Sequence, residues 1–231
     1  MKATRKKIFS KKLPPHRVRG PFLGMHFLAD WKFTKGDEPD HPYNPPCGNT
    51  LMQIVTGRPM DKWNVMMQAY MAAIASARSH AYLQSPYFIP PEPIMKVLQN
   101  VALNGVDVRV MIPYRGDKGV LPPWASCSYI KEALEAGIRI YLYRKGYLHA
   151  KTMTIDDSLV TIGSTSIDFR GFDQDFETNA FMYDKNLAVQ QREIFHEDLK
   201  DAELIDPLDW DKRPFLHKAK ESVARVFSQV L

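Results

Sequence analysis

Apolar residues recur at helical spacing between positions 61 and 78. Those that fall on one face of a helix with 3.6 residues per turn are Trp63, Met66, Met67, Tyr70, Ile74 and Ala77. The pattern predicts an amphipathic helix over residues 61–78. A stripe of methionine and aromatic residues at this spacing is typical of a helix face that packs into a core.

From residue 81 onward, short apolar runs alternate with helical patterns. Strands are expected at residues 81–85, 107–113 and 139–143, and helices between them at 92–104 and 128–136. Gly105 and Gly137 stand where helix C-caps belong. Because a strand–helix–strand crossover is almost always right-handed, this order predicts neighbouring parallel strands.

Shorter connections follow in the second half of the chain. Further strands are expected at residues 149–155, 159–164 and 176–183, and helices at 187–199 and 218–227. Asp156, Asp157 and Ser158 favour a turn between the first two of these strands. The sequence therefore predicts an α/β fold in which a mixed, mostly parallel sheet is flanked by helices.

A proline-dense segment divides the chain. Residues 39–47 read P-D-H-P-Y-N-P-P-C, which cannot hold a helix or a central strand. We expect residues 1–47 to form an amino-terminal arm and linker, and residues 48–231 to form one globular domain. A chain of 231 residues is long enough to bury a sizeable α/β core.

The charge of the chain is positive and unevenly spread. With 45% hydrophobic and 25% charged residues the composition is that of a globular protein, which excludes a disordered or fibrous class. The formal net charge of +5 favours anionic partners: a phospholipid surface, a nucleic acid or a phosphorylated small molecule. The basic residues that precede Asp30 form either a polybasic arm or a solvated terminus; they are Lys2, Arg5, Lys6, Lys7, Lys11, Lys12, Arg17 and Arg19.

Neither cysteine belongs to a recognisable motif. Cys47 and Cys127 form no C-x-x-C pair, so no metal site and no disulfide framework is expected. The longest apolar runs are well short of the ~20 residues that a membrane helix needs. The chain is therefore expected to be soluble or peripheral to a membrane.

The residues with the clearest chemistry are His149 and Lys151. On a strand they would project to the same face, because side chains alternate with period two. An imidazole beside an ammonium suits phosphodiester chemistry, since the imidazole can attack phosphorus or move a proton while the cation neutralises phosphate oxygens. Asp156 has the opposite parity and lies at the predicted turn, so we interpret it as an orienting or structural residue.

The spacing of these residues resembles a known signature. His149, Lys151 and Asp156 match the H-x-K-x4-D motif of the phospholipase D superfamily, and Gly163 and Ser164 follow where that family has its glycine and serine or threonine. Further blocks resemble bacterial cardiolipin synthases in order, so the similarity covers nearly the whole chain from about Val18. They are S-P-Y-F-I-P at Ser85, N-G-V-D-V-R-V-M-I-P at Asn104, E-A-G-I-R-I-Y-L-Y at Glu135, L-H-A-K-T-M-T-I-D-D at Leu148 and F-E-T-N-A-F-M-Y-D at Phe176.

The resemblance implies a phospholipase D-like catalytic domain over residues 48–231 and a phosphatidyl transfer through a phosphohistidine, without metal or cofactor. In the family pattern Ser164 and Ser166 occupy phosphate-binding positions, and Glu177 resembles the acidic residue that holds the second ring nitrogen of the nucleophile. The implied partners are anionic phospholipids such as phosphatidylglycerol; nucleic acid is less favoured. The implied location is the cytoplasmic face of a bacterial inner membrane, with peripheral contact.

Three positions depart from the family pattern. Ser166 and Asp175 stand where the family usually has asparagine, and Gly171 stands where it usually has serine. An asparagine amide can donate a hydrogen bond whereas a carboxylate cannot, so Asp175 is expected to place negative charge near a bound phosphate.

The chain carries one H-x-K-x4-D motif, whereas the family pairs two across a pseudo-twofold axis. A second motif would have to come from another chain or from a missing half. Three hypotheses follow: a truncated or split synthase half, a homodimeric single-motif phosphodiesterase or nuclease, and an inactive lipid-binding module.

Overall fold

The computed structural model describes residues 28, 31–32, 34–36, 49–115 and 121–228. The chain divides into two compact units, residues 1–54 and 55–231. The basic residues of the predicted amino-terminal arm and Cys47 lie outside the described residues, so the predicted domain boundary after residue 47 stays a prediction. The sheet, the pocket and the helices discussed below belong to residues 55–231, apart from the start of the first strand.

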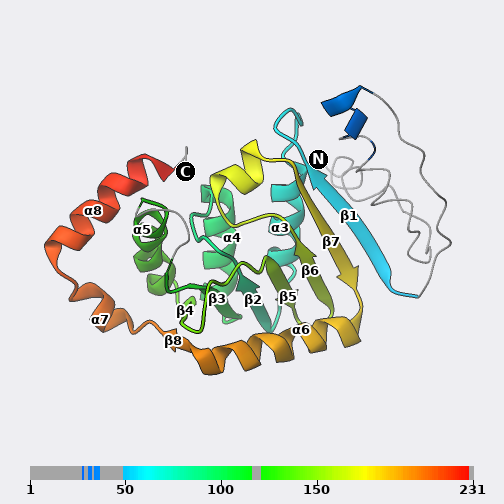
Figure 1. Cartoon of the computed structure of the whole chain (residues 1–231). Coiled ribbons are helices and arrows are strands. Elements are labelled where there is room, and N and C mark those ends of the chain that lie inside the picture. Colours follow the sequence, from blue (N-terminus) through cyan, green and yellow to red (C-terminus); the bar gives the residue numbers. More distant parts are fainter. Residues whose placement is uncertain (1–27, 29–30, 33, 37–48, 116–120, 229–231) are drawn as a thin grey trace. The chain divides into compact units, whose positions relative to one another are not determined.

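The described strands form one sheet in the order β1-β7-β6-β5-β2-β3-β4-β8 (Figure 1). Strand β2 pairs in parallel with β3, and β3 pairs in parallel with β4. The strand bounds are β1 Leu51–Gly57, β2 His80–Gln84, β3 Asp107–Pro113, β4 Arg139–Tyr143, β5 Thr152–Ile155, β6 Leu159–Gly163, β7 Glu177–Tyr183 and β8 Ala202–Leu204.

The sheet is mixed as predicted, but the expectation that it is mostly parallel is wrong. The pairs β2–β5, β5–β6, β6–β7 and β4–β8 are all antiparallel. Parallel strands need a long crossover, whereas β5 and β6 are joined by the predicted three-residue turn. Asp156 and Asp157 both adopt φ +50° in that turn, a left-handed conformation that aspartate tolerates better than most residues.

Helices cover both faces of the sheet. Helices α3 (Val65–Ala75), α4 (Glu92–Leu103) and α5 (Leu121–Glu135) enclose the main core, into which Ala81 and Leu83 of β2 point. The intervening Tyr82 points to the opposite face, where its ring stacks on Phe195 at 5.0 Å between ring centres. Phe195 belongs to α6 (Lys185–Asp198). Because side chains alternate along β2, its residues therefore pack into two separate apolar clusters, one on each face of the sheet.

The predicted helices are confirmed, and the largest differences at their starts are those of α3 and α5. Helix α3 begins at Val65 because the Asn64 side chain caps it, accepting a hydrogen bond from the Met67 backbone N–H at 2.9 Å. Helix α5 begins at Leu121, seven residues before the predicted start, with Pro122 and Pro123 in its first turn. Proline is tolerated there because the first N–H groups of a helix have no intrahelical partner.

Two short helices end the described chain. Helix α7 (Pro207–Asp211) is capped by Asp206, and α8 (Phe215–Val226) packs against α5. Gly105 and Gly137 have φ of +89° and +85°, as expected of residues that follow helix ends. Among the described residues no helix is both long enough and apolar enough to span a bilayer.

One strand boundary bears on the chemistry. The predicted strand at residues 149–155 is three residues too long, because β5 begins only at Thr152. His149 and Lys151 therefore lie in the segment that leads into β5. Strand alternation does not explain how their side chains meet, and their contact has to be taken from the structure itself.

Candidate functional site

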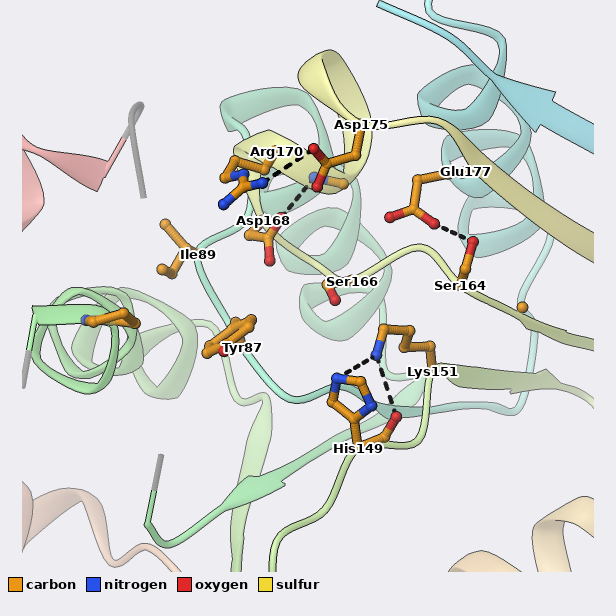
Figure 2. A pocket seen from close by; sticks show the side chains of 13 residues that line it. Tyr87, Ile89, His149, Lys151, Ser164, Ser166, Asp168, Arg170, Asp175 and Glu177 are labelled. Carbon is orange, nitrogen blue, oxygen red and sulfur yellow. Dashed lines mark hydrogen bonds and ion pairs between the residues drawn. The ribbon is translucent and has the colours of Figure 1, made fainter. Parts of the chain in front are cut away.

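A pocket of about 660 Å³ lies where the segment before β5 meets the loop that joins β6 to β7 (Figure 2). The segment after β2 and the start of α5 complete its wall. Its lining residues are Tyr87, Ile89, Pro122, His149, Lys151, Gly163, Ser164, Ser166, Asp168, Arg170, Gly171, Asp175 and Glu177. The structure thus brings together five of the six predicted site residues.

His149 and Lys151 form the cationic side of the pocket. The Lys151 ammonium lies 3.1 Å from Nε2 of His149 and 3.3 Å from the His149 carbonyl oxygen. The Tyr147 ring stacks beside the imidazole at 5.5 Å between ring centres and 28° between planes. An ammonium group only donates hydrogen bonds, so this contact favours the tautomer in which Nε2 accepts and Nδ1 carries the ring proton. Nε2 of the imidazole therefore lies beside the Lys151 ammonium in the pocket.

Glu177 and Ser164 form a second pair at the start of β7. The Ser164 hydroxyl donates to the Glu177 carboxylate and accepts a hydrogen bond from the Thr178 backbone N–H at 3.0 Å. Burial raises the pKa of the Glu177 carboxyl above its ordinary value, and the hydrogen bond from Ser164 opposes that rise. Figure 2 shows the carboxylate pointing toward Ser164. The predicted bond from Glu177 to a catalytic imidazole is not among the contacts of the described residues, and that role stays a prediction.

The loop from Ser166 to Glu177 is shaped by a turn of π-helix at Arg170–Gln174. The buried Asp168 carboxylate accepts a hydrogen bond from the Gly171 backbone N–H at 2.7 Å, and burial raises the pKa of Asp168. A Cβ atom on Gly171 would lie 2.6 Å from the Ser166 backbone oxygen, so a side chain there would displace the loop. At Gly171, where the family usually has serine, the Ser166 backbone is thus too close for a side chain.

The departure at Asp175 is compensated in part. Its carboxylate lies 3.2 Å from the Arg170 guanidinium, so its negative charge is shared with a cation on the same loop. Figure 2 shows this ion pair at the rim of the pocket, and shows the Ser166 hydroxyl pointing into the pocket. The Asp175 carboxylate, which the sequence predicted to be unfavourable near a phosphate, is therefore paired with Arg170. The pair also engages the Arg170 guanidinium, which could otherwise bind an anion.

Asp156 does not line the pocket. Its carboxylate accepts three backbone hydrogen bonds, from Arg78 at 2.6 Å, Ser79 at 2.7 Å and His80 at 2.8 Å. It thereby ties the turn between β5 and β6 to the segment that enters β2. This placement agrees with the interpretation of Asp156 as an orienting or structural residue.

Several lining residues were not predicted as site residues. Tyr87 and Ile89 belong to the S-P-Y-F-I-P block, and Asp168 and Arg170 follow the motif by a few positions. The signal that could have found Tyr87 and Ile89 is their place within a block already matched to a family, whereas Asp168 and Arg170 lie between two matched blocks. Among the described residues, no three histidine, cysteine or acidic side chains gather in a way that could hold a metal ion. Cys127 is a free thiol on α5 whose pKa burial raises to about 11.

Comparison with known proteins gives a consistent assignment. Residues 70–199 match the family described as cardiolipin synthase, PLD-like domain. The chain is 40% identical over 216 residues to a cardiolipin synthase of Geobacillus kaustophilus, covering 90% of this chain and 43% of that protein. It is 36% identical over 215 residues to the major cardiolipin synthase ClsA of Bacillus subtilis, covering 90% of this chain and 44% of that protein. The chain thus spans less than half the length of these relatives.

Solved structures show the same fold at low sequence identity. A phosphatidylserine synthase of Haemophilus influenzae superposes with a TM-score of 0.66 at 13% identity, covering 90% of this chain and 53% of that one. Nuc, a phospholipase D family member from Salmonella typhimurium, superposes with a TM-score of 0.57 at 21% identity, covering 67% of this chain and 99% of that one. These likenesses confirm the predicted phospholipase D-like fold.

Proposed function

Since this chain belongs to the family of cardiolipin synthase, PLD-like domains, we propose that it is a phosphatidyltransferase domain of cardiolipin synthesis that works through a phosphohistidine intermediate. The observation that carries the proposal is the contact between Lys151 and Nε2 of His149 inside the pocket. The contact favours the tautomer with the ring proton on Nδ1, and it puts a cation beside the proposed attacking nitrogen.

The proposed chemistry has two displacements at one phosphorus atom. Nε2 of His149 attacks the phosphodiester of a donor phospholipid, and the bond from phosphorus to the departing headgroup alcohol breaks as that oxygen takes a proton from a general acid. A hydroxyl of a second phospholipid then attacks the phosphohistidine and gives its proton to the deprotonated general acid, and the bond from phosphorus to His149 breaks to release the imidazole. Lys151 stabilises the negative charge on the non-bridging oxygens in both steps.

The general acid is proposed to be a second histidine from outside this sequence. It must lie on the opposite side of phosphorus from His149, and the sequence holds one H-x-K-x4-D motif. A second copy of this chain or another part of a longer protein would supply it. The proposed donor is an anionic phospholipid such as phosphatidylglycerol, and the proposed location is the cytoplasmic face of a bacterial inner membrane.

The experiment that tests the proposal is replacement of the nucleophile. In any preparation that transfers phosphatidyl groups, alone or complemented by a second motif, His149→Ala should lower turnover by roughly a thousandfold or more, because no other group can form the covalent bond. Transfer is measured with short-chain phosphatidylglycerol and chromatographic separation of the lipid products.

The matched control is His217→Ala, which removes an exposed histidine on α8 away from the pocket and should leave turnover unchanged. Retention of more than about a tenth of the turnover by His149→Ala would contradict the proposal. A nucleic-acid diester assayed in parallel distinguishes a nuclease from a lipid enzyme.

A further inference from the structure

One side of α8 carries apolar side chains that the rest of the described chain leaves exposed. Phe215 is 83% exposed, Val226 is 77% exposed and Leu216 is 64% exposed. Val223 and Phe227 are also exposed. At 100° per residue these five positions, the last of which is the C-cap residue Phe227, fall within about a third of the helix circumference. We call these five residues the apolar face of α8.

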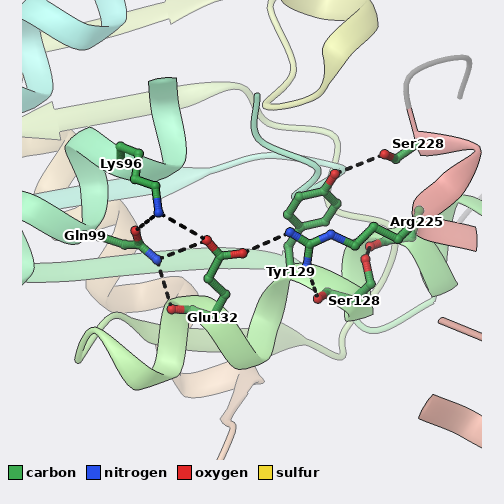
Figure 3. Close-up of polar contacts among 8 residues, drawn as sticks. Lys96, Gln99, Ser128, Tyr129, Glu132, Arg225 and Ser228 are labelled. Carbon is green, nitrogen blue, oxygen red and sulfur yellow. Dashed lines mark hydrogen bonds and ion pairs between the residues drawn. The ribbon is translucent and has the colours of Figure 1, made fainter. Parts of the chain in front are cut away.

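The opposite side of α8 is fixed against α5, so the apolar face cannot simply rotate inward. Figure 3 shows the contacts: the Ser228 hydroxyl lies 3.0 Å from the Tyr129 hydroxyl, and the Arg225 guanidinium donates to the Ser128 carbonyl at 3.1 Å. Arg225 also lies 3.0 Å from the Glu132 carboxylate. With Ala224 buried beneath them, these bonds set the direction in which the apolar face points.

Positive charge borders the apolar face. Lys218 and Lys220 lie on either side of it in helical projection, and Lys220 lies over the Trp124 ring at 5.3 Å from the ring centre. The acidic residue of α8, Glu221, is buried and paired with Arg213 at 2.5 and 3.0 Å. The exposed charge on this helix is therefore cationic.

An outward apolar face with basic borders is the pattern of a helix that lies in a membrane interface. Apolar side chains enter the boundary between headgroups and acyl chains, while lysine stems extend along it and place their ammonium groups among anionic headgroups. A helix that was only solvated would not need five large apolar residues on its exposed side. The basic borders favour an anionic surface over a purely apolar protein groove.

We propose that α8 is an interfacial helix that lays its apolar face on the surface of an anionic phospholipid bilayer. The surface interaction is separate from the proposed reaction, since α8 contributes no residue to the pocket. It has a consequence for the pocket nonetheless. Helix α8 is bonded to α5, and Pro122 at the start of α5 lines the pocket, so a bound α8 would hold that wall at the lipid surface.

The test is sedimentation of the full chain with vesicles of equal parts phosphatidylglycerol and phosphatidylcholine. The double change Leu216→Asp and Val223→Asp should lower the partition coefficient by at least about tenfold, because two apolar side chains can no longer enter the interface. The single change Val226→Asp should lower it by a smaller factor. The matched control, Leu103→Asp, alters a similarly exposed leucine on α4, 72% exposed, and should bind as wild type does.

Charge and background controls complete the design. Lys218→Gln with Lys220→Gln should weaken binding to these vesicles and make it less sensitive to salt. Any vesicle binding through the basic residues between positions 2 and 19 would be the same in every variant, because none of the substitutions changes those residues. Every measurement is repeated with His149→Ala, so that loss of the proposed reaction and loss of the surface interaction are distinguished.

Two outcomes would overturn the proposal. One is equal vesicle binding by wild type and by Leu216→Asp with Val223→Asp, with thermal unfolding showing that both are folded. The other is a dimer in solution that this double change dissociates while vesicle binding is unaffected, which would assign the apolar face to a second copy of the chain.

Discussion

The imidazole of His149 lines the pocket, with Nε2 facing the Lys151 ammonium. The Lys151 ammonium lies 3.1 Å from Nε2, which favours the tautomer with the ring proton on Nδ1. When a bound substrate breaks this contact, the same ammonium is close enough to neutralise a phosphate oxygen. The two side chains come from one tripeptide, so their contact needs no long-range partner. This is why the motif alone could indicate this pair of side chains.

Arg170, which lines the pocket, is held in an ion pair with Asp175 that the sequence did not reveal. Asp175→Asn removes the carboxylate that lies 3.2 Å from the Arg170 guanidinium. The freed Arg170 should then bind anions, so we expect inorganic phosphate or vanadate to bind about threefold to tenfold more tightly. Isothermal titration calorimetry gives the affinity.

The control for this change is Asp211→Asn, which breaks an exposed pair with Lys131 at 3.1 Å outside the pocket and should not alter anion binding. Weaker or unchanged binding in Asp175→Asn would mean that the pair with Asp175 is what orients Arg170 for the anion.

At the residue scale, the sequence identified five pocket residues but not their partners. His149, Lys151, Ser164, Ser166 and Glu177 all line the pocket. The bond from Ser164 to Glu177 joins positions thirteen residues apart, just after β6 and at the start of β7, and depends on strand register. Spacing alone carries no information about that register.

At the scale of elements, the turn between β5 and β6 fixes the end of β5 that lies away from His149. Asp156 receives three backbone hydrogen bonds from residues 78–80, which fastens this turn to the start of β2. The neighbouring β2–β5 pairing is antiparallel and places Gln84 opposite Thr152, next to the His149 segment. The third member of the motif therefore acts through the backbone.

Asp156→Ala should lower the free energy of unfolding by roughly 2 to 3 kcal/mol, because three N–H groups lose a charged acceptor. Asp156→Asn should cost less, since one side-chain oxygen remains. Urea denaturation measures the change, and Asp61→Ala serves as an exposed control. If Asp156 took part in catalysis directly, turnover per folded molecule would collapse even where the variant stays folded, and that result would contradict the structural role.

Element boundaries were predicted where local signals decide them and missed where they do not. Helix α4 was predicted to end at residue 104 and ends at Leu103, with Gly105 at φ +89°. The start of α5 was placed seven residues late, since the helix begins at Leu121 with Pro122 and Pro123 in its first turn, where proline is stable. Strand β8 has three residues and no apolar alternation that would announce it.

At the scale of the whole molecule, the α/β class and the phospholipase D-like fold were predicted and the strand directions only in part. Helical crossovers gave the parallel order of β2, β3 and β4 correctly. The antiparallel pairing of β5 with β6 follows from their three-residue connection, whereas β6 and β7 are joined by a longer loop and β5 pairs with β2 across the sequence, which no local pattern encodes.

A site composed of His149 and a second histidine from outside this sequence makes a prediction about assembly. If this chain is active by itself, two copies must present His149 to one phosphorus across a twofold axis. Activity per chain should then rise with protein concentration in step with dimer formation measured by light scattering. Mixing wild type with excess His149→Ala should abolish most turnover, since each site needs two imidazoles. A strictly monomeric protein with full diesterase activity would contradict the composite site.

The central claim is that His149 becomes covalently bound to phosphorus, and its most direct test is the mass of one peptide. Trypsin cleavage after Lys145 and Lys151 releases residues 146–151, which contain His149 as their sole histidine. An active preparation is incubated with short-chain phosphatidylglycerol and quenched in base, in which a phosphohistidine bond survives. The account predicts this peptide with the added mass of the phosphatidyl group, and its absence in His149→Ala. Turnover accompanied by a phosphatidyl adduct on a different residue, or by none at all, would contradict it.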